Sequence, residues 1–168
     1  SGYNLWRGNH FNAKVEGNQY HDNKMIEKIK NIKPSKNYDL DLDEMYMKEA
    51  IKNIKENPNY FLKLYFKKVF SFIFIDLNST YENYYSYLNI LPKIIISITT
   101  LLGILLLAKK DHILIYYSLY YFFNIFLFSL FFILPRYSLM LLPVQIILTC
   151  YLIEKFKGYL NHDNKKIN

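Results

Sequence analysis

Residues that could stack on a ligand or bind a phosphate gather in a segment near the start of the chain. Gly2 to Ala13 read G-Y-N-L-W-R-G-N-H-F-N-A and include the only tryptophan of the sequence. Asn and Gly favour tight turns, whereas Trp6 can stack on a ligand and Arg7 can grip a phosphate with two parallel hydrogen bonds. We therefore take Trp6, Arg7 and Asn9 as candidate substrate-binding residues. The alternative is a structural loop that is packed by its own tryptophan.

A second candidate is the stretch Pro135-Arg136-Tyr137, with Pro143 two helical turns further on. Arg136 is the only charged residue between Asp111 and Glu154, and it lies between two apolar stretches. An arginine at the edge of a membrane span meets lipid phosphates. Arg136 and Tyr137 are therefore candidate substrate-binding residues, and the alternative is an arginine that only anchors the span at the interface.

Other reactive side chains show weaker patterns. Asp39, Asp41 and Asp43 form D-x-D-x-D, which could hold a divalent cation but also suits the first turn of a helix, where the helix dipole favours acids. His21 and Asp22 could form an acid–base pair or be ordinary surface residues. The four histidines and the single cysteine lack zinc-ligand spacing, and no nucleophile-elbow, phosphate-loop or dinucleotide motif occurs. We predict no catalytic residue and no metal site in this chain.

The elements that must position these residues fall into two halves. Of the 168 residues, 52% are hydrophobic, and 24 of the 35 charged residues lie in residues 1–86. Three apolar stretches follow, at about 88–108, 113–134 and 137–153. A bilayer core needs about 20 helical residues, with roughly 17 as the lower limit. These stretches are apolar nearly all round, so they suit lipid rather than a soluble helical core.

Residues 1–86 are expected to be mainly helical outside the membrane. Residues 1–19 are expected to form an ordered loop, and residues 25–32 a short helix. The Asp41 and Glu44 spacing resembles a capping box for a helix that Asn57-Pro58 ends. A further helix at about 58–75 carries three lysines on an otherwise apolar surface, which is typical of a helix that lies on lipid headgroups.

The predicted fold is thus all-α and integral to a membrane, with an outer helical region at 1–86 and a membrane region at 87–168. The positive-inside rule predicts which segments lie in the cytoplasm. They are the loop with Lys109 and Lys110 and the short tail with four lysines after the last span. Residues 1–86 and Arg136 then face outward. Within the spans, Thr99 and Gly103 have the spacing of residues that let helices pack closely.

The net charge of +7 arises mostly at the edges of the apolar stretches, so we expect membrane lipids as partners and no nucleic acid. Because the chain opens at Ser1 with a motif that begins at once, we expect it to be the C-terminal part of a longer protein.

Three segments, in order, resemble bacterial membrane glycosyltransferases related to the dolichyl-phosphate-mannose protein mannosyltransferases. Gly2 to Ala13 resemble the G-x-N-x-W-x-G-N-N-x-N-A loop of that family, with His10 in place of the second Asn of G-N-N and Phe11 where Pro is common. Residues 49–64, with E-A-I, I-K-E-N-P and F-L-K-L, resemble its helix–Asn-Pro–helix. Pro135 to Pro143 resemble its late R-Y-x-L-x-x-x-P element.

The resemblance implies a GT-C enzyme of the bacterial inner membrane that transfers a hexose or pentose from a polyprenyl-phosphate donor on the outer, periplasmic face. The catalytic carboxylates of that family lie in an early outer loop, so this chain alone is expected to be inactive and to need the earlier spans of the same protein. No cofactor is predicted, and the resemblance allows a divalent metal ion only in the complete enzyme. The lipid-linked sugar donor is the implied partner.

Two other interpretations of the sequence stay open. One is a non-enzymatic three-span membrane anchor or assembly subunit with an outer helical domain. The other is a fragment of a polysaccharide polymerase, ligase or flippase, which would also combine spans with outer loops.

Overall fold

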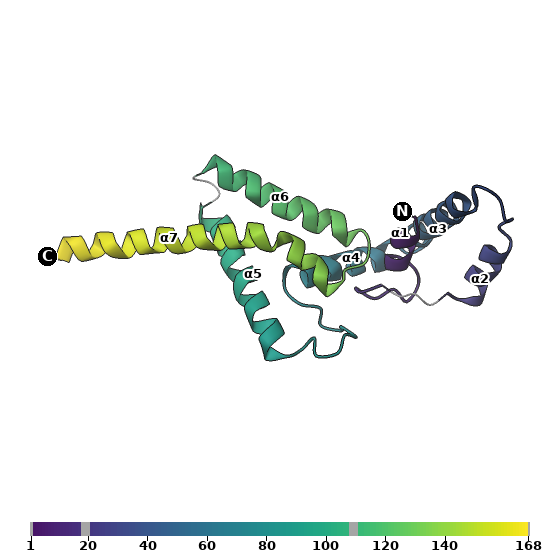
Figure 1. Ribbon diagram of the computed structural model, residues 1–168, viewed down its shortest axis with the longest axis horizontal. Coiled ribbons are helices and arrows are strands. Elements are labelled where there is room, and N and C mark those ends of the chain that lie inside the picture. The colour runs from purple at the N-terminus through teal and green to yellow at the C-terminus, as the bar shows by residue number, and fades with distance from the viewer. Residues whose placement is uncertain (1, 18–20, 108–110, 168) are drawn as a thin grey trace. The chain divides into compact units, whose positions relative to one another are not determined.

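The computed structural model describes residues 2–17, 21–107 and 111–167, and over these residues it contains helices and no strands (Figure 1). This confirms the all-α fold with three long apolar helices. The helices are α1 (Gly2–Gly8), α2 (Asn23–Lys30), α3 (Tyr38–Glu56), α4 (Pro58–Ile73), α5 (Tyr87–Leu107), α6 (His112–Ser129), a 3₁₀ helix η2 (Pro135–Leu141) and α7 (Leu142–Ile167).

The chain divides into two compact units, and the division does not follow the sequence order. The first unit holds residues 1–72, 76–79 and 126–135, and the second holds residues 73–75, 80–125 and 136–168. Residues 126–135, which include the last turn of α6, therefore pack with the N-terminal region, although α5 and most of α6 separate them from it in sequence.

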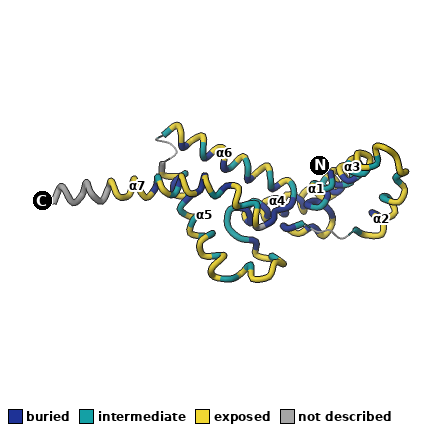
Figure 2. Tube along the Cα trace, viewed as in Figure 1, coloured by how far each residue is buried: buried dark blue, intermediate teal, exposed yellow. Residues whose placement is uncertain are grey.

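The core of the first unit lies where α1 packs against α3 (Figure 2). Trp6, Met25, Tyr46 and Ala50 are buried together there. A smaller cluster of Ala13, Phe61 and Leu64 joins the segment after α1 to α4.

Helix α1 corrects the expectation of a loop over residues 1–19, because residues 2–8 are helical. A helix this short is unstable alone, since few of its backbone groups have partners within it. The carboxylate of Asp43, on α3, accepts hydrogen bonds from the backbone N–H groups of Gly2 (2.8 Å) and Tyr3 (3.1 Å). The first turn of α1 is thus capped by a residue 41 positions away.

The start of α3 also differs from the expectation. The helix begins at Tyr38, so Asp41 and Glu44 lie inside it and form no capping box. Its end at Glu56 and the start of α4 at Pro58 confirm the break at Asn57-Pro58. The short helix expected at residues 25–32 is present as α2, where the Asp22 side chain accepts from the Met25 N–H and caps the first turn.

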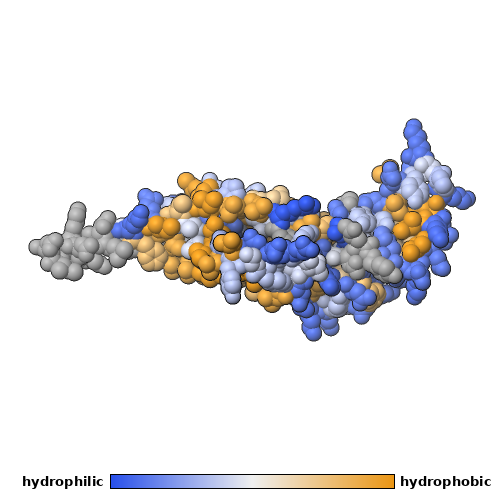
Figure 3. Space-filling view, turned by 60° about the horizontal axis from the view of Figure 1, so that its bottom comes forward, coloured by the Kyte–Doolittle hydropathy of each residue, from blue (hydrophilic) through white to orange (hydrophobic). Residues whose placement is uncertain are grey.

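Within the described residues, three helices are long and apolar enough to cross a membrane, over Tyr87–Leu106, His112–Ser129 and Arg136–Gly158. Hydrophobic residues cover most of the visible surface formed by α5 to α7, and hydrophilic residues gather over α2 and α3 (Figure 3). The second apolar stretch is helical only to Ser129, since Ile133 N–H then bonds to the carbonyl of Val15 (2.8 Å) rather than continuing the helix. The third begins as the 3₁₀ helix η2 and continues in α7 beyond Ile153.

Small polar side chains join α5 to α7 in the second unit, as expected for closely packed spans. The hydroxyls of Thr99 and Thr149 are 2.9 Å apart. A Cβ at Gly103 would lie 2.9 Å from the carbonyl oxygen of Leu148, so the glycine permits this close approach. Lys109 and Lys110, on which the predicted orientation rests, lie outside the described residues.

Candidate functional site

The candidate site is built on α1, which is held at both ends by close backbone contacts. A Cβ at Gly2 would lie 1.9 Å from the carbonyl oxygen of Asp43, and one at Gly8 would lie 2.4 Å from the carbonyl oxygen of Phe131. Any larger residue would require the backbone to shift. The two glycines of the Gly2–Ala13 motif therefore fix α1 between α3 and residues 126–135.

Asn9 holds the next part of the motif in place. Its side-chain N–H₂ group donates to the carbonyls of Leu5 (2.9 Å) and Leu130 (2.6 Å). Its Oδ1 accepts from the ammonium of Lys68 (3.2 Å), which also donates to the carbonyl of Gly8 (2.8 Å). Asn9 is buried and thus joins α1 to α4 and to the segment after α6.

Lys68 is an unusual partner, because only 1% of its surface is exposed. Burial disfavours the charged ammonium and lowers the pKa of Lys68 to about 7. Its two acceptors are a carbonyl and an amide oxygen, neither of which carries a full charge. The motif is therefore fastened by a lysine that can lose its proton near neutral pH.

Trp6 and Arg7 are also packed rather than free to grip a ligand. Trp6 is 4% exposed, and its indole stacks with the rings of His10 and His21 at centroid distances of 4.8 Å each. The guanidinium of Arg7 lies 4.2 Å from the centre of the Phe132 ring, in a cation–π contact. These contacts favour the structural role for the motif's core that was the alternative to direct substrate binding.

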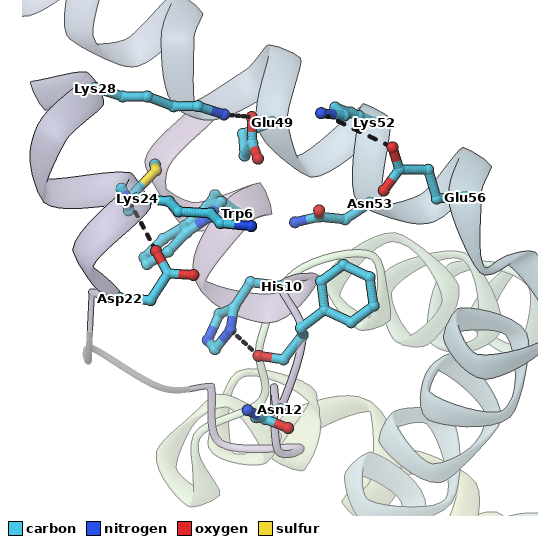
Figure 4. Close-up of a pocket in the computed structure, with 12 residues that line it drawn as sticks. Trp6, His10, Asn12, Asp22, Lys24, Lys28, Glu49, Lys52, Asn53 and Glu56 are labelled. Atoms are coloured by element: carbon cyan, nitrogen blue, oxygen red, sulfur yellow. Dashed lines mark hydrogen bonds and ion pairs between the residues drawn. The ribbon is translucent and has the colours of Figure 1, made fainter. Parts of the chain in front are cut away.

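A pocket of about 440 Å³ opens beside Trp6, between α1, α2 and α3 (Figure 4). The indole of Trp6, the imidazole of His10 and the ring of Phe11 form its aromatic part. The rest of its lining is polar or charged, apart from Met25. These lining residues are Asn12, Asp22, Lys24, Lys28, Glu49, Lys52, Asn53 and Glu56.

The charges around this pocket nearly balance. Three lysines face three acids, and two of the pairs are ion pairs: Lys28 with Glu49, and Lys52 with Glu56 at 3.8 Å. Such a lining offers many hydrogen-bond donors and acceptors with little net charge. It suits a polar, uncharged ligand rich in hydroxyl groups better than it suits a free phosphate.

The structure places the candidate residues of the sequence in different surroundings. Trp6 lines the pocket. Arg7 and Asn9 follow Trp6 closely in the chain, but they contact Phe132 and Leu130 inside the first unit. Arg136 is exposed and Tyr137 half-buried, and both belong to the second unit.

Sequence reasoning missed the polar lining on α3. Four lining residues share one face of this helix, because they lie three or four positions apart along it. They are Glu49, Lys52, Asn53 and Glu56. That spacing is visible in the sequence. What the sequence does not show is that this face lies opposite Trp6 and α2.

The D-x-D-x-D motif serves structure in part. Asp43 caps α1, and Asp39 and Asp41 lie in the first turn of α3, where the helix dipole favours acids. Among the residues that the structure describes, no group of three histidine, cysteine or acidic side chains is arranged to hold a metal ion.

Comparison with known proteins gave no relative: no family model, no curated protein and no solved structure matches this chain.

Proposed function

We propose that this chain is the sugar-handling and late membrane-spanning part of a bacterial inner-membrane glycosyltransferase, which transfers a hexose or pentose from a polyprenyl-phosphate donor on the periplasmic face. The observation that carries this proposal is the nearly neutral, hydrogen-bonding pocket beside Trp6. Part of its lining comes from residues 2–13 and 49–64, two of the segments in which the sequence resembles such enzymes.

A sugar fits the chemistry of this pocket. Its hydroxyls both donate and accept hydrogen bonds, so they can pair with lysine and asparagine donors and with carboxylate acceptors. Its ring carbons can rest on the aromatic wall formed by Trp6 and Phe11. We assign the pocket to the sugar of the donor or of the acceptor, and the phosphate to a separate cationic group.

Arg136 and Tyr137 are our proposed partners for the donor phosphate. Arg136 is exposed at the start of the third candidate span, in the 3₁₀ helix η2. A guanidinium binds phosphate oxygens in a forked geometry that a lysine cannot reproduce.

The acid and base of the reaction are assigned to a different part of the complete enzyme. The resemblance puts the catalytic carboxylates in an early outer loop, and no residue of this chain is proposed as catalytic. Transfer by this chain alone is therefore not expected, whereas sugar binding is.

The test is a binding titration of the purified chain in nanodiscs with short-chain polyprenyl-phosphate sugars, using sugar-free polyprenyl phosphate as the reference ligand. A sugar should improve the affinity over the reference. Asn53→Ala should lose about tenfold of that gain in affinity, because it removes a buried amide and leaves a sugar hydroxyl in the pocket without its hydrogen-bond partner. Asn59→Ala, on the exposed first turn of α4, is the matched control and should bind as the wild type does.

Equal affinity for every sugar and for the sugar-free lipid would overturn the assignment of the pocket. Unchanged binding by a folded Asn53→Ala variant would have the same effect. The absence of any sugar binding by the complete protein would favour the membrane anchor or assembly subunit instead.

A further inference from the structure

A second pocket of the first unit lies against α4 and is lined by an excess of positive charge. It has a volume of about 360 Å³. Its apolar floor is formed by Ala13, Val15 and Leu64, and its rim carries three exposed lysines, Lys14, Lys63 and Lys67, together with Tyr60, Asp76 and Asn78.

The two α4 lysines of this rim lie one helical turn apart, so their ammonium groups can approach the same ligand. Lys14 comes from the segment after α1, and Tyr60 links that segment to α4 by donating to the carbonyl of Ala13 (3.3 Å). Three cations against the single carboxylate of Asp76 leave the pocket positive. Asp76 is buried, and its Oδ1 accepts from the Asn78 N–H (2.9 Å).

The face of α4 beside these lysines is apolar and exposed. Leu62, Phe66 and Phe70 are 56%, 59% and 46% exposed, and their spacing of four places them in one stripe along the helix. At 100° per residue, this stripe is centred about 80° around the helix from Lys63 and Lys67. The third side of α4, with Phe61, Leu64 and Lys68, is buried.

We propose that this pocket binds the phosphate group of an anionic membrane lipid, with the lipid chain lying along Leu62, Phe66 and Phe70. The three lysines neutralise the phosphate, and the apolar stripe enters the acyl-chain region next to it. The order of these faces around α4 matches the order of layers in a bilayer, where phosphate lies directly above hydrocarbon. This proposal does not rest on the sugar assignment, because any lipid phosphate has the same chemistry.

The neighbouring stripe argues for a lipid rather than for free inorganic phosphate. A soluble anion would use only the lysines, and three exposed phenylalanine and leucine side chains would then stay in water at a cost of apolar hydration. A lipid uses both faces at once.

The experiment is native mass spectrometry of the full chain in neutral detergent, titrated with phosphatidylglycerol, polyprenyl phosphate, phosphatidylcholine and inorganic phosphate. The two anionic lipids should bind more tightly than phosphatidylcholine. Lys63→Gln/Lys67→Gln should weaken binding of the anionic lipids about 30-fold, from about 1 kcal/mol for each lysine near a lipid surface. Lys33→Gln/Lys36→Gln changes the net charge equally, away from the pocket, and should bind as the wild type does.

A third variant separates the lipid from the free ion. Leu62→Ser/Phe66→Ser should weaken binding of both anionic lipids and leave any binding of inorganic phosphate unchanged. Inorganic phosphate that binds as tightly as the lipids would overturn the lipid part of the proposal. Equal lipid binding by the two lysine variants would overturn the site itself. Tighter binding of polyprenyl phosphate than of phosphatidylglycerol would identify the occupant as a polyprenyl-phosphate lipid. Equal affinity for these two lipids would identify the occupant as the bulk anionic phospholipid of the membrane.

Discussion

At the scale of single residues, the most consequential side chain is Lys68. A buried ammonium that donates to the carbonyl of Gly8 and to the amide oxygen of Asn9 gains no full negative charge from these two acceptors to offset its lost hydration. Its neutral form is therefore favoured, and its pKa falls to about 7. An unfolded chain would hold the same proton up to about pH 10.5.

This difference predicts that folding stability rises with pH. Between about pH 7 and pH 10 the unfolded state binds more protons at Lys68 than the folded state does, so raising the pH favours the folded state. The slope should be about 1 kcal/mol per pH unit in this window, because one pKa unit corresponds to roughly 1.4 kcal/mol. Below pH 7 both states hold the proton, and the cost of burial is present in full.

Urea unfolding at several pH values, followed by the fluorescence of Trp6, measures this slope. Lys68→Met removes the titrating group and should flatten the curve. Lys55→Met, an exposed lysine of α3, is the control and should keep the slope. A Lys68→Met variant with the wild-type slope would show that another group is responsible.

At the scale of elements, α1 depends on a hydrogen-bonding cap that another helix supplies. Its seven residues contain few internal hydrogen bonds, and its first two N–H groups are satisfied by Asp43 of α3. Trp6, on α1, is one wall of the pocket between α1, α2 and α3. The pocket wall therefore depends on a carboxylate that does not touch the pocket.

Asp43→Ala should consequently destabilise the first unit by about 1–2 kcal/mol, the usual cost of losing a helix cap. The loss should concentrate in α1, where amide hydrogen exchange of residues 3–8 should speed up more than that of α3. Asp39→Ala is the control, because it removes an acid from the first turn of α3 and leaves the Asp43 cap of α1 in place. It should lower the free energy of unfolding by only a few tenths of a kcal/mol. Equal exchange in the two variants would refute the capping role.

The elements that sequence reasoning found are those with local signals. Continuous apolar stretches marked α5, α6 and α7, Asn57-Pro58 marked the break between α3 and α4, and residues 25–32 marked α2. The elements that it missed depend on distant partners. α1 needs Asp43, and the end of α6 at Ser129 is followed by a segment whose backbone pairs with Val15.

The candidate site shows the same limit. Trp6 could be singled out by composition alone, and Asn9 by its place in a turn-forming motif. The sequence could not predict that Asn9 is buried or that Lys28 pairs with Glu49. Both features follow from the tertiary packing of the first unit. Sequence reasoning therefore singled out the segment that lines this pocket in part, but it could not show that Asn9 and Arg7 make packing contacts within the fold.

At the scale of the whole molecule, the central prediction is its orientation in the membrane. With the loop between α5 and α6 inside, residues 1–86 lie outside. In a Cys150→Ser background, Lys30→Cys should react with an impermeant thiol reagent in intact spheroplasts, and His112→Cys should react only after the membrane is opened. Both positions are exposed in the fold, so protection reports the membrane and not burial. Labelling of His112→Cys alone in intact spheroplasts would reverse the topology.

The contacts of Gly8, Asn9 and Val15 with residues 130–133 also dictate an order of events during synthesis. The amide of Asn9 bonds to a carbonyl 121 positions later in the chain, and Val15 bonds to Ile133. The ribosome adds about 5–20 residues per second, so the first unit stays incomplete for several seconds after Asn9 is made. Throughout that time α5 and most of α6 are made and must leave the ribosome. The earliest segment of this chain is thus among the last to reach its native packing, because it waits for residues 130–133 to be made.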